Sequence, residues 1–150
     1  MNHIILLVLF LPWKILNYDD FKGKPSRDLS LAAVSSVYLS WTADVNDTII
    51  YNVKCSVEFN EKKSFIREKN PWVLNHEQGH LDLGLAFARE ANSISKFRML
   101  FSQEDYDALR IRINYEWGAM NDLYDKETDG SRDHKMQAIW DQKIKIMLSK

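Results

Sequence analysis

The clearest pattern along the chain is an alternation of apolar and polar residues over positions 49–60. An alternation with a period of two residues predicts a β-strand that buries one of its faces. A second alternation covers residues 37–42, and Asn46-Asp47 between the two runs predicts a hairpin turn. Residues 64–67 are expected to form a short third strand. The apolar face predicted for the main strand consists of Ile49, Tyr51, Val53, Cys55, Val57 and Phe59.

In the second half of the chain, apolar residues recur every three or four positions, which predicts three helices. The first spans residues 71 to about 98, because Asn70 is a good N-cap and Pro71 suits the first helical position. Ser102 is expected to cap the second helix, which breaks at Asp129-Gly130 before the third. The stripes expected to face the core are Tyr106, Leu109, Ile113, Trp117, Met120 and Tyr124, and then Met136, Ile139, Trp140, Ile144 and Met147. This order of elements predicts an α+β fold with N-terminal antiparallel strands followed by helices.

The length, charge and cysteine content of the chain limit the number of domains, the kinds of partner and the disulfides to expect. A chain of 150 residues suits a single domain, here assigned to residues 13–150, with a real core. The net charge is −1 with scattered Lys and Arg, so we expect no nucleic-acid partner. The single cysteine, Cys55, allows no intramolecular disulfide, and its place on the apolar face predicts a buried core thiol.

The N-terminus carries an uninterrupted apolar run over residues 4–11. This run is too short to span a bilayer as a helix, but it is long enough for the apolar core of a signal peptide. No Lys or Arg precedes the run and no small-residue cleavage site follows it, so a buried N-terminal strand is the alternative. We expect residues 1–12 to be signal-like and the protein to be exported to the periplasm or cell envelope, with a cytoplasmic location as the alternative.

The residues of greatest chemical interest are His76-Glu77-Gln78-Gly79-His80, an H-E-x-x-H pattern inside the first predicted helix. Two histidines four positions apart on a helix point the same way, so both Nε2 atoms can reach one Zn²⁺. Glu77 is rotated by about 100° from His76, where its carboxylate can reach a water beside the metal but is poorly placed to bind the metal itself. The pattern therefore predicts metal-assisted hydrolysis with one zinc ion per chain. A pair of histidines in an ordinary buried helix is the alternative.

Several stretches together resemble one known family. The most specific are the lead-in Asp20-Phe21-Lys22-Gly23 and the His76-Glu77-Gln78-Gly79-His80 core, and residues 31–36, 88–89, 124–128 and 137–140 complete the set. In this order they resemble the bacterial family catalogued as domain of unknown function 922, whose members are described as candidate zinc-dependent proteases. The resemblance covers nearly the whole chain after about Trp13. It implies a zincin-like fold in which an antiparallel sheet precedes the metal-binding helix.

Carried over by position, the resemblance makes His76 and His80 metal ligands and Glu77 the catalytic acid and base. A catalytic zinc site usually has three protein ligands and a water. Family members commonly have a histidine just after the tyrosine-aspartate and threonine landmark, whereas Thr128 is followed here by Asp129 and Gly130. We choose His134 as the third ligand, because imidazole suits zinc. The other candidates are Asp129, Asp125, Glu127 and Glu116.

The expected function is that of a zinc-dependent peptidase or related hydrolase acting on a peptide or protein substrate. Tyr124 or His134 is expected to stabilise the oxyanion. By analogy with zincins, the strand around residues 49–59, or its neighbour, is expected to pair with an extended peptide. The missing histidine motivates an alternative, a catalytically inactive zincin-like module that binds a metal or a protein. The retained Glu77 favours the enzyme, because a purely structural zinc site does not need a general base.

Overall fold

The structure, a computed structural model, describes residues 14–27 and 30–150. The predicted signal-like segment at residues 1–12 lies outside this part of the chain. A short 3₁₀ turn, η1 (Tyr18–Asp20), opens the described region. The strands are β1 (Ala33–Val34), β2 (Val37–Asn46), β3 (Ile49–Phe59), β4 (Phe65–Ile66) and β5 (Leu100–Phe101), and the helices are α1 (Pro71–Arg98), α2 (Gln103–Thr128) and α3 (His134–Leu148). None of these helices is long and apolar enough to cross a membrane.

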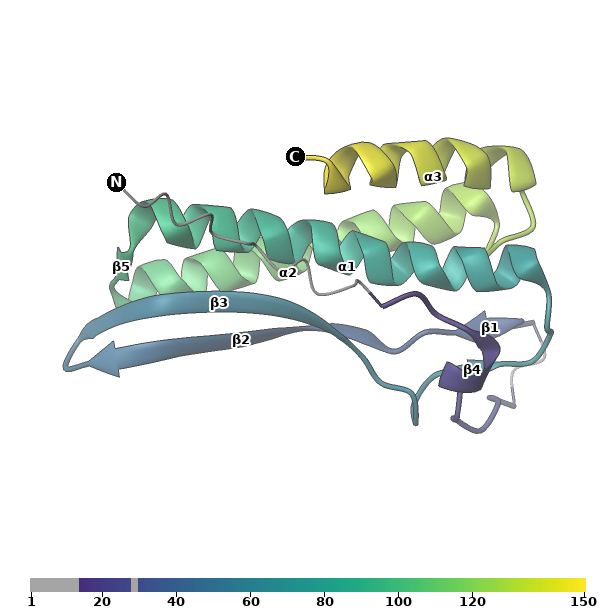
Figure 1. Ribbon diagram of the computed structural model, residues 1–150, viewed down its shortest axis with the longest axis horizontal. Coiled ribbons are helices and arrows are strands. Elements are labelled where there is room, and N and C mark those ends of the chain that lie inside the picture. Colours follow the sequence, from purple (N-terminus) through teal and green to yellow (C-terminus); the bar gives the residue numbers. More distant parts are fainter. Residues whose placement is uncertain (1–13, 28–29) are drawn as a thin grey trace, which may run out of the picture.

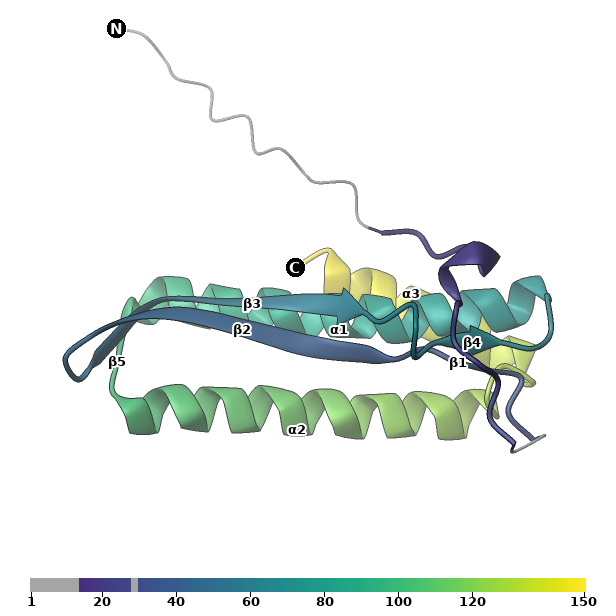
Figure 2. The same ribbon diagram turned by 90° about the horizontal axis from the view of Figure 1, so that it is seen from below.

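Helix α1 lies at the centre of the fold. The long β2–β3 hairpin covers one side of α1 and α3 lies along the opposite side (Figure 1). Helix α2 runs lengthwise beside α1 and also contacts α3 and β3 (Figure 2). The prediction of an α+β fold, with an antiparallel sheet followed by three helices, is confirmed. Because α1 packs against the hairpin and both other helices, the helix with the H-E-x-x-H pattern is held on several sides.

Two small antiparallel sheets make up the β structure. In one, β2, β3 and β5 pair in that order, and in the other β1 pairs with β4. The main hairpin contains a bulge, because Thr42 pairs with Lys54 while Asp44 pairs with Tyr51, which leaves one extra residue on β3. Asn52 lies in this bulge and has a φ of 50°, in the left-handed region that asparagine tolerates better than most residues.

The bulge changes which residues of β3 face the core. Val53 and Cys55 are buried as predicted, but Ile50 is buried in place of Ile49, which is 42% exposed. The prediction that Ile49 shares the buried face was therefore wrong. An extra residue in a strand reverses the alternation of its side chains, and the period-two pattern cannot reveal this reversal.

The predicted helix boundaries agree with the structure. The Asn70 side chain accepts a hydrogen bond from the backbone N–H of Trp72 at the start of α1, and Pro71 is the first helical residue. Ser102 caps α2, and the helix ends at Asp129 in a left-handed conformation. Asp133 caps α3 by accepting from two backbone N–H groups, so α3 begins directly at His134. These local signals fix both ends of each helix within a few residues.

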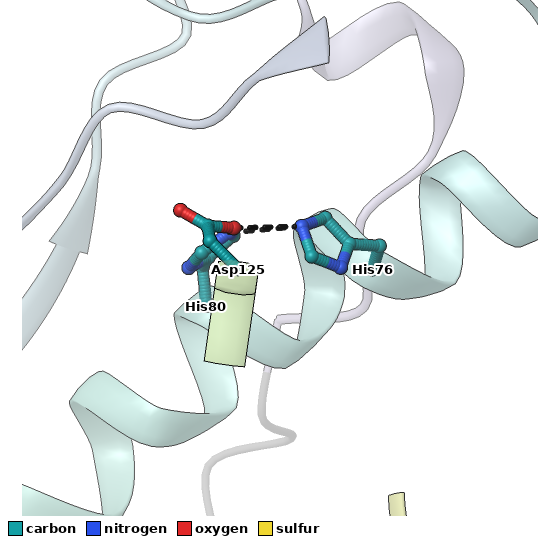
Figure 3. Close-up of side chains that lie close together, drawn as sticks. All are labelled: His76, His80 and Asp125. Atoms are coloured by element: carbon teal, nitrogen blue, oxygen red, sulfur yellow. Dashed lines mark hydrogen bonds and ion pairs between the residues drawn. The ribbon is translucent and has the colours of Figure 1, made fainter. Parts of the chain in front are cut away.

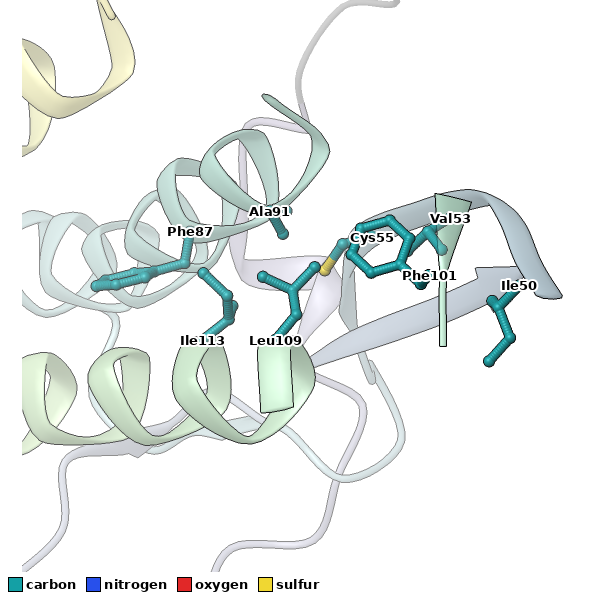
Figure 4. Packing of buried hydrophobic residues seen from close by; sticks show 9 residues of the cluster. Ile50, Val53, Cys55, Phe87, Ala91, Phe101, Leu109 and Ile113 are labelled. Atoms are coloured by element: carbon teal, nitrogen blue, oxygen red, sulfur yellow. The ribbon is translucent and has the colours of Figure 1, made fainter. Parts of the chain in front are cut away.

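The main hydrophobic core lies between the hairpin, α1 and α2 (Figure 4). Cys55 is buried there as predicted, and burial raises the pKa of its thiol to about 11. A second cluster joins Leu83, Tyr124, Trp140 and Ile144, and it packs α3 onto α1 and α2. One predicted core residue of α3 was wrong, because Ile139 is 48% exposed. The polar residue Gln137 is fully buried on this helix instead.

Candidate metal centre

Three side chains from two helices converge at one point beside α1 (Figure 3). His76 and His80 project from α1, and Asp125 reaches them from α2. The Asp125 Oδ1 atom lies 3.0 Å from Nε2 of each histidine, and the two Nε2 atoms are 3.3 Å apart. The histidine side chains are 4% and 14% exposed, whereas Asp125 is 55% exposed at the rim. The site is thus closed on the helix side and open beside Asp125.

The spacing of these three atoms fits a transition metal. Ligand atoms about 2.0–2.2 Å from a tetrahedral zinc ion lie roughly 3.3–3.6 Å from one another. The observed separations of 3.0, 3.0 and 3.3 Å need only a small outward shift to reach that range. Two imidazoles and one carboxylate are also the ligand set of a common class of catalytic zinc site, in which the fourth position stays open. The group can therefore hold a metal ion.

The converging atoms lie in a pocket of about 440 Å³. Its wall is formed by residues 30–35, Val73, His76, Glu77, His80, Asp125, Gly130, Ser131 and Arg132. Residues 30–35 include β1, which pairs only with β4 among the described strands. Arg132 Nη2 donates to the Ser30 carbonyl at 3.2 Å, and this bond joins the loop after α2 to the segment that leads into β1. The pocket therefore extends from the three ligand atoms to β1.

Glu77 has an unusual environment in this pocket. The residue is 4% exposed, yet its Oε2 atom has no hydrogen-bond partner among the described residues. A buried carboxylate oxygen without a partner is costly, and a catalytic role or a bound water or ion accounts for many such groups. Glu77 is not one of the three converging side chains, but it lines the same pocket.

The contact between Asp125 on α2 and the two histidines on α1 shifts the pKa of Asp125 and of His80. Burial alone would raise the pKa of Asp125, but its hydrogen bonds to His76 and His80 outweigh burial and lower the pKa of this carboxyl. Burial alone would lower the pKa of His80, but the hydrogen bond from Asp125 and the nearby charge of Glu77 outweigh burial and raise the pKa of the imidazole. The site therefore favours a negative carboxylate next to a positive charge, whether that charge is a proton or a metal ion.

The two central residues of the H-E-x-x-H pattern have structural roles. The side-chain Oε1 of Gln78 accepts a hydrogen bond from the Leu16 backbone N–H at 2.7 Å, and its Nε2 donates to the Lys14 carbonyl at 3.3 Å. Gln78 thus holds the chain at residues 14–16 against α1. Gly79 lies under the ring of Tyr124, where any side chain would overlap the ring. The Tyr124 hydroxyl donates to the His76 carbonyl at 3.1 Å, so this close approach also fixes the backbone of one of the two converging histidines.

The structure places His134, the residue chosen as third ligand, apart from the two converging histidines. His134 is exposed and its ring stacks on Trp72, with centroids 4.0 Å apart and ring planes 8° from parallel. Asp133 fixes this position, because its cap makes His134 the first residue of α3. The third member of the converging group is Asp125, one of the alternative candidates for the third ligand. Asp129, Glu127 and Glu116 are not part of the converging group either.

The two residues expected to stabilise an oxyanion are also placed elsewhere. Tyr124 is fully buried, and its hydroxyl hydrogen is used in the bond to His76. Neither Tyr124 nor His134 lines the pocket. The strand β3, which was expected to pair with substrate, does not line it either, whereas residues 30–35 do. Arg132 is the cationic side chain that does line the pocket.

Sequence reasoning missed three polar side chains that contact the histidines. Gln137 Oε1 lies 3.1 Å from His76 Nδ1, Thr128 Oγ1 lies 3.3 Å from the same nitrogen, and Asn121 Oδ1 lies 2.7 Å from His80 Nδ1. A signal was present for two of them. Asn121 and Thr128 share the face of α2 that carries Tyr124, and a polar residue beside a buried stripe often has a buried partner.

Comparisons of this chain with family models, with curated proteins and with solved structures found no match.

Proposed function

We propose that this protein is a zinc-dependent hydrolase acting on peptides, with a zincin-like fold and a family relationship as implied by the resemblance of its motifs. His76, His80 and Asp125 hold the metal, with one zinc ion per chain. The observation that carries the proposal is the convergence of three ligand atoms within 3.0 to 3.3 Å of one another, next to an unpaired carboxylate oxygen of Glu77. Bound zinc supplies Lewis-acid chemistry that polarises a carbonyl group and lowers the pKa of a water molecule.

Glu77 acts as the general base and then as the general acid. Its carboxylate lines the pocket; it accepts a proton from the water that attacks the substrate carbonyl and returns this proton to the leaving amine. No other described side chain or backbone group forms a hydrogen bond with its Oε2 atom, so none competes with a water molecule for that oxygen. Proton transfer by a positioned side chain typically contributes about 10²- to 10⁴-fold to the rate.

The β1 segment supports a peptide as the substrate. Residues 30–35 line the pocket, and among the described strands β1 pairs with β4 alone. An extended peptide can add to an open strand edge through main-chain hydrogen bonds, which would place one of its carbonyl groups near the metal. The alternative of an inactive module was motivated by a missing third ligand, and the carboxylate of Asp125 weakens that motive.

The test has two steps. Protein purified without a chelator or a metal-affinity tag should contain about one zinc ion per chain. Wild type and Glu77→Gln are then compared for cleavage of casein or a pooled peptide mixture, with a chelator as control. Glu77→Gln should retain zinc and lose about 10²-fold or more of the activity, because the substitution keeps the shape and removes the base. Equal cleavage by both proteins would refute the mechanism, and cleavage by neither would favour the inactive module.

A further inference from the structure

The orientation of the Gln137 amide is fixed by its surroundings. Its Nε2 donates to Asp141 Oδ1 at 2.8 Å and to the Tyr124 hydroxyl at 2.6 Å. A carboxylate can only accept, and the Tyr124 hydroxyl uses its own hydrogen in the bond to the His76 carbonyl. The Oε1 atom of Gln137 therefore faces His76. It accepts a hydrogen bond from the Nδ1–H group of His76, with 3.1 Å between Oε1 and Nδ1.

The other histidine has an equivalent partner on α2. Asn121 Nδ2 donates to the Trp117 carbonyl at 2.9 Å, which leaves Asn121 Oδ1 to accept from His80 Nδ1 at 2.7 Å. Thr128 adds to the arrangement around His76, because its hydroxyl donates to the Tyr124 carbonyl at 2.7 Å. Its oxygen can then only accept from His76 Nδ1, at 3.3 Å. Both ligand histidines thus carry a hydrogen on Nδ1.

We propose that Gln137 and Asn121 are positioning residues that prepare both histidines for the metal. Each amide oxygen holds a hydrogen on Nδ1, so the lone pair of each Nε2 is directed toward the point shared with Asp125. This inference rests on the proposed metal function. A neutral imidazole has two tautomers, and only the one with a hydrogen on Nδ1 can bind a metal through Nε2. Outer partners that fix the tautomer and the ring orientation typically contribute about 10- to 100-fold in metal affinity.

The test measures zinc affinity by competition with a chromophoric chelator, independently of any enzymatic activity. Asn121→Leu and Gln137→Met keep the approximate shape and remove the acceptor, so each should lower zinc affinity about 10- to 100-fold. Asn121→Asp restores an acceptor oxygen opposite His80 Nδ1 and should bring the affinity back to that of wild type or higher. A purely structural role for Asn121 would not predict this rescue, because Asp cannot donate to the Trp117 carbonyl.

Asn114→Leu is the matched control. Asn114 lies on the same helix and makes the same kind of bond, from Nδ2 to the Arg110 carbonyl at 2.8 Å, but it is exposed and contacts neither histidine. Its substitution should leave zinc affinity unchanged. Because Gln137 is fully buried, thermal unfolding is measured alongside, and the half-buried Asn121 decides the outcome if Gln137→Met does not fold.

Two results would overturn this inference and leave the proposed function standing. They are unchanged zinc affinity in folded Asn121→Leu, or an equal loss in Asn121→Leu and Asn121→Asp. If wild type itself binds no zinc, both this inference and the proposed function fail.

Discussion

Tyr124 packs directly against Gly79, so closely that a Cβ at position 79 would lie 2.7 Å from Cζ of the tyrosine ring. The ring cannot easily move away. Its hydroxyl donates to the His76 carbonyl and accepts from Gln137, and the whole residue is fully buried. The glycine in the H-E-x-x-H pattern of this protein therefore allows α2 to approach α1, and this approach brings Asp125 to the two histidines.

Gly79→Ala should destabilise the protein, although alanine is the better helix former by about 1 kcal/mol. The overlap with Tyr124 forces the two helices apart, and forced overpacking typically costs about 1–3 kcal/mol. Zinc affinity should fall as well, because Asp125 moves with α2. Gly118→Ala is the control. A Cβ there meets nothing within 4 Å, so this variant should be more stable by about 1 kcal/mol. Chemical denaturation measures both, and a stabilised Gly79→Ala would contradict the packing argument.

The ligand assignment predicts a clear contrast between Asp125 and His134. Asp125→Ala, His76→Ala and His80→Ala should each lower zinc affinity by more than the roughly 10- to 100-fold typical of an outer partner. His134→Ala should bind zinc as wild type does, because its ring stacks on Trp72 outside the pocket. Zinc content after dialysis against a weak chelator measures the difference. Full zinc retention in the His76→Ala/His80→Ala double variant would exclude the site.

Stability should depend on pH in opposite ways with and without zinc. The raised pKa of His80 contributes stability that is present below the unfolded value of about 6.5 and is lost as the pH rises through the folded pKa. The lowered pKa of Asp125 contributes stability that is present above about pH 4 and is lost as the pH falls through the folded pKa. In the metal-free protein the pair therefore stabilises most between about pH 4 and 6.5.

Zinc needs a deprotonated His80, so zinc and the proton compete for this side chain. The increase in Tm on adding zinc should be small near pH 5.5 and should grow toward about pH 8. Thermal unfolding with zinc and with chelator, over this range, measures the increase. An increase in Tm that is independent of pH would show that His80 does not bind the metal.

Gln78→Ala should release the chain at residues 14–16 from α1 with little effect on the metal. The variant loses the hydrogen bond from the Leu16 backbone and the bond to the Lys14 carbonyl, and a typical net loss is about 1 kcal/mol for each bond. Limited proteolysis should cleave residues 14–23 faster, while zinc affinity stays close to wild type. Gln103→Ala is the control, because Gln103 is exposed and its side chain donates to Asp107 on its own helix. Equal proteolysis of both variants would contradict this role of Gln78.

The sequence alone determined the features that depend on neighbouring residues. Asn70 with Pro71, and Ser102, placed the starts of α1 and α2, because a helix cap is formed by residues within one turn of each other. The spacing of His76 and His80 placed both imidazoles on one side of α1 for the same reason.

Only the tertiary structure decided which residues come from elsewhere in the chain. Asp125 and His134 were both candidates for the third ligand, and only the packing of α2 on α1 brings Asp125 next to the two histidines. This packing includes the close contact between Gly79 and Tyr124, which are 45 positions apart in the chain. The contact between Gln137 and His76 likewise depends on the packing of α3 on α1. Local patterns carry no information on such contacts, because the helix faces that meet are selected by the fit of side chains across the whole core.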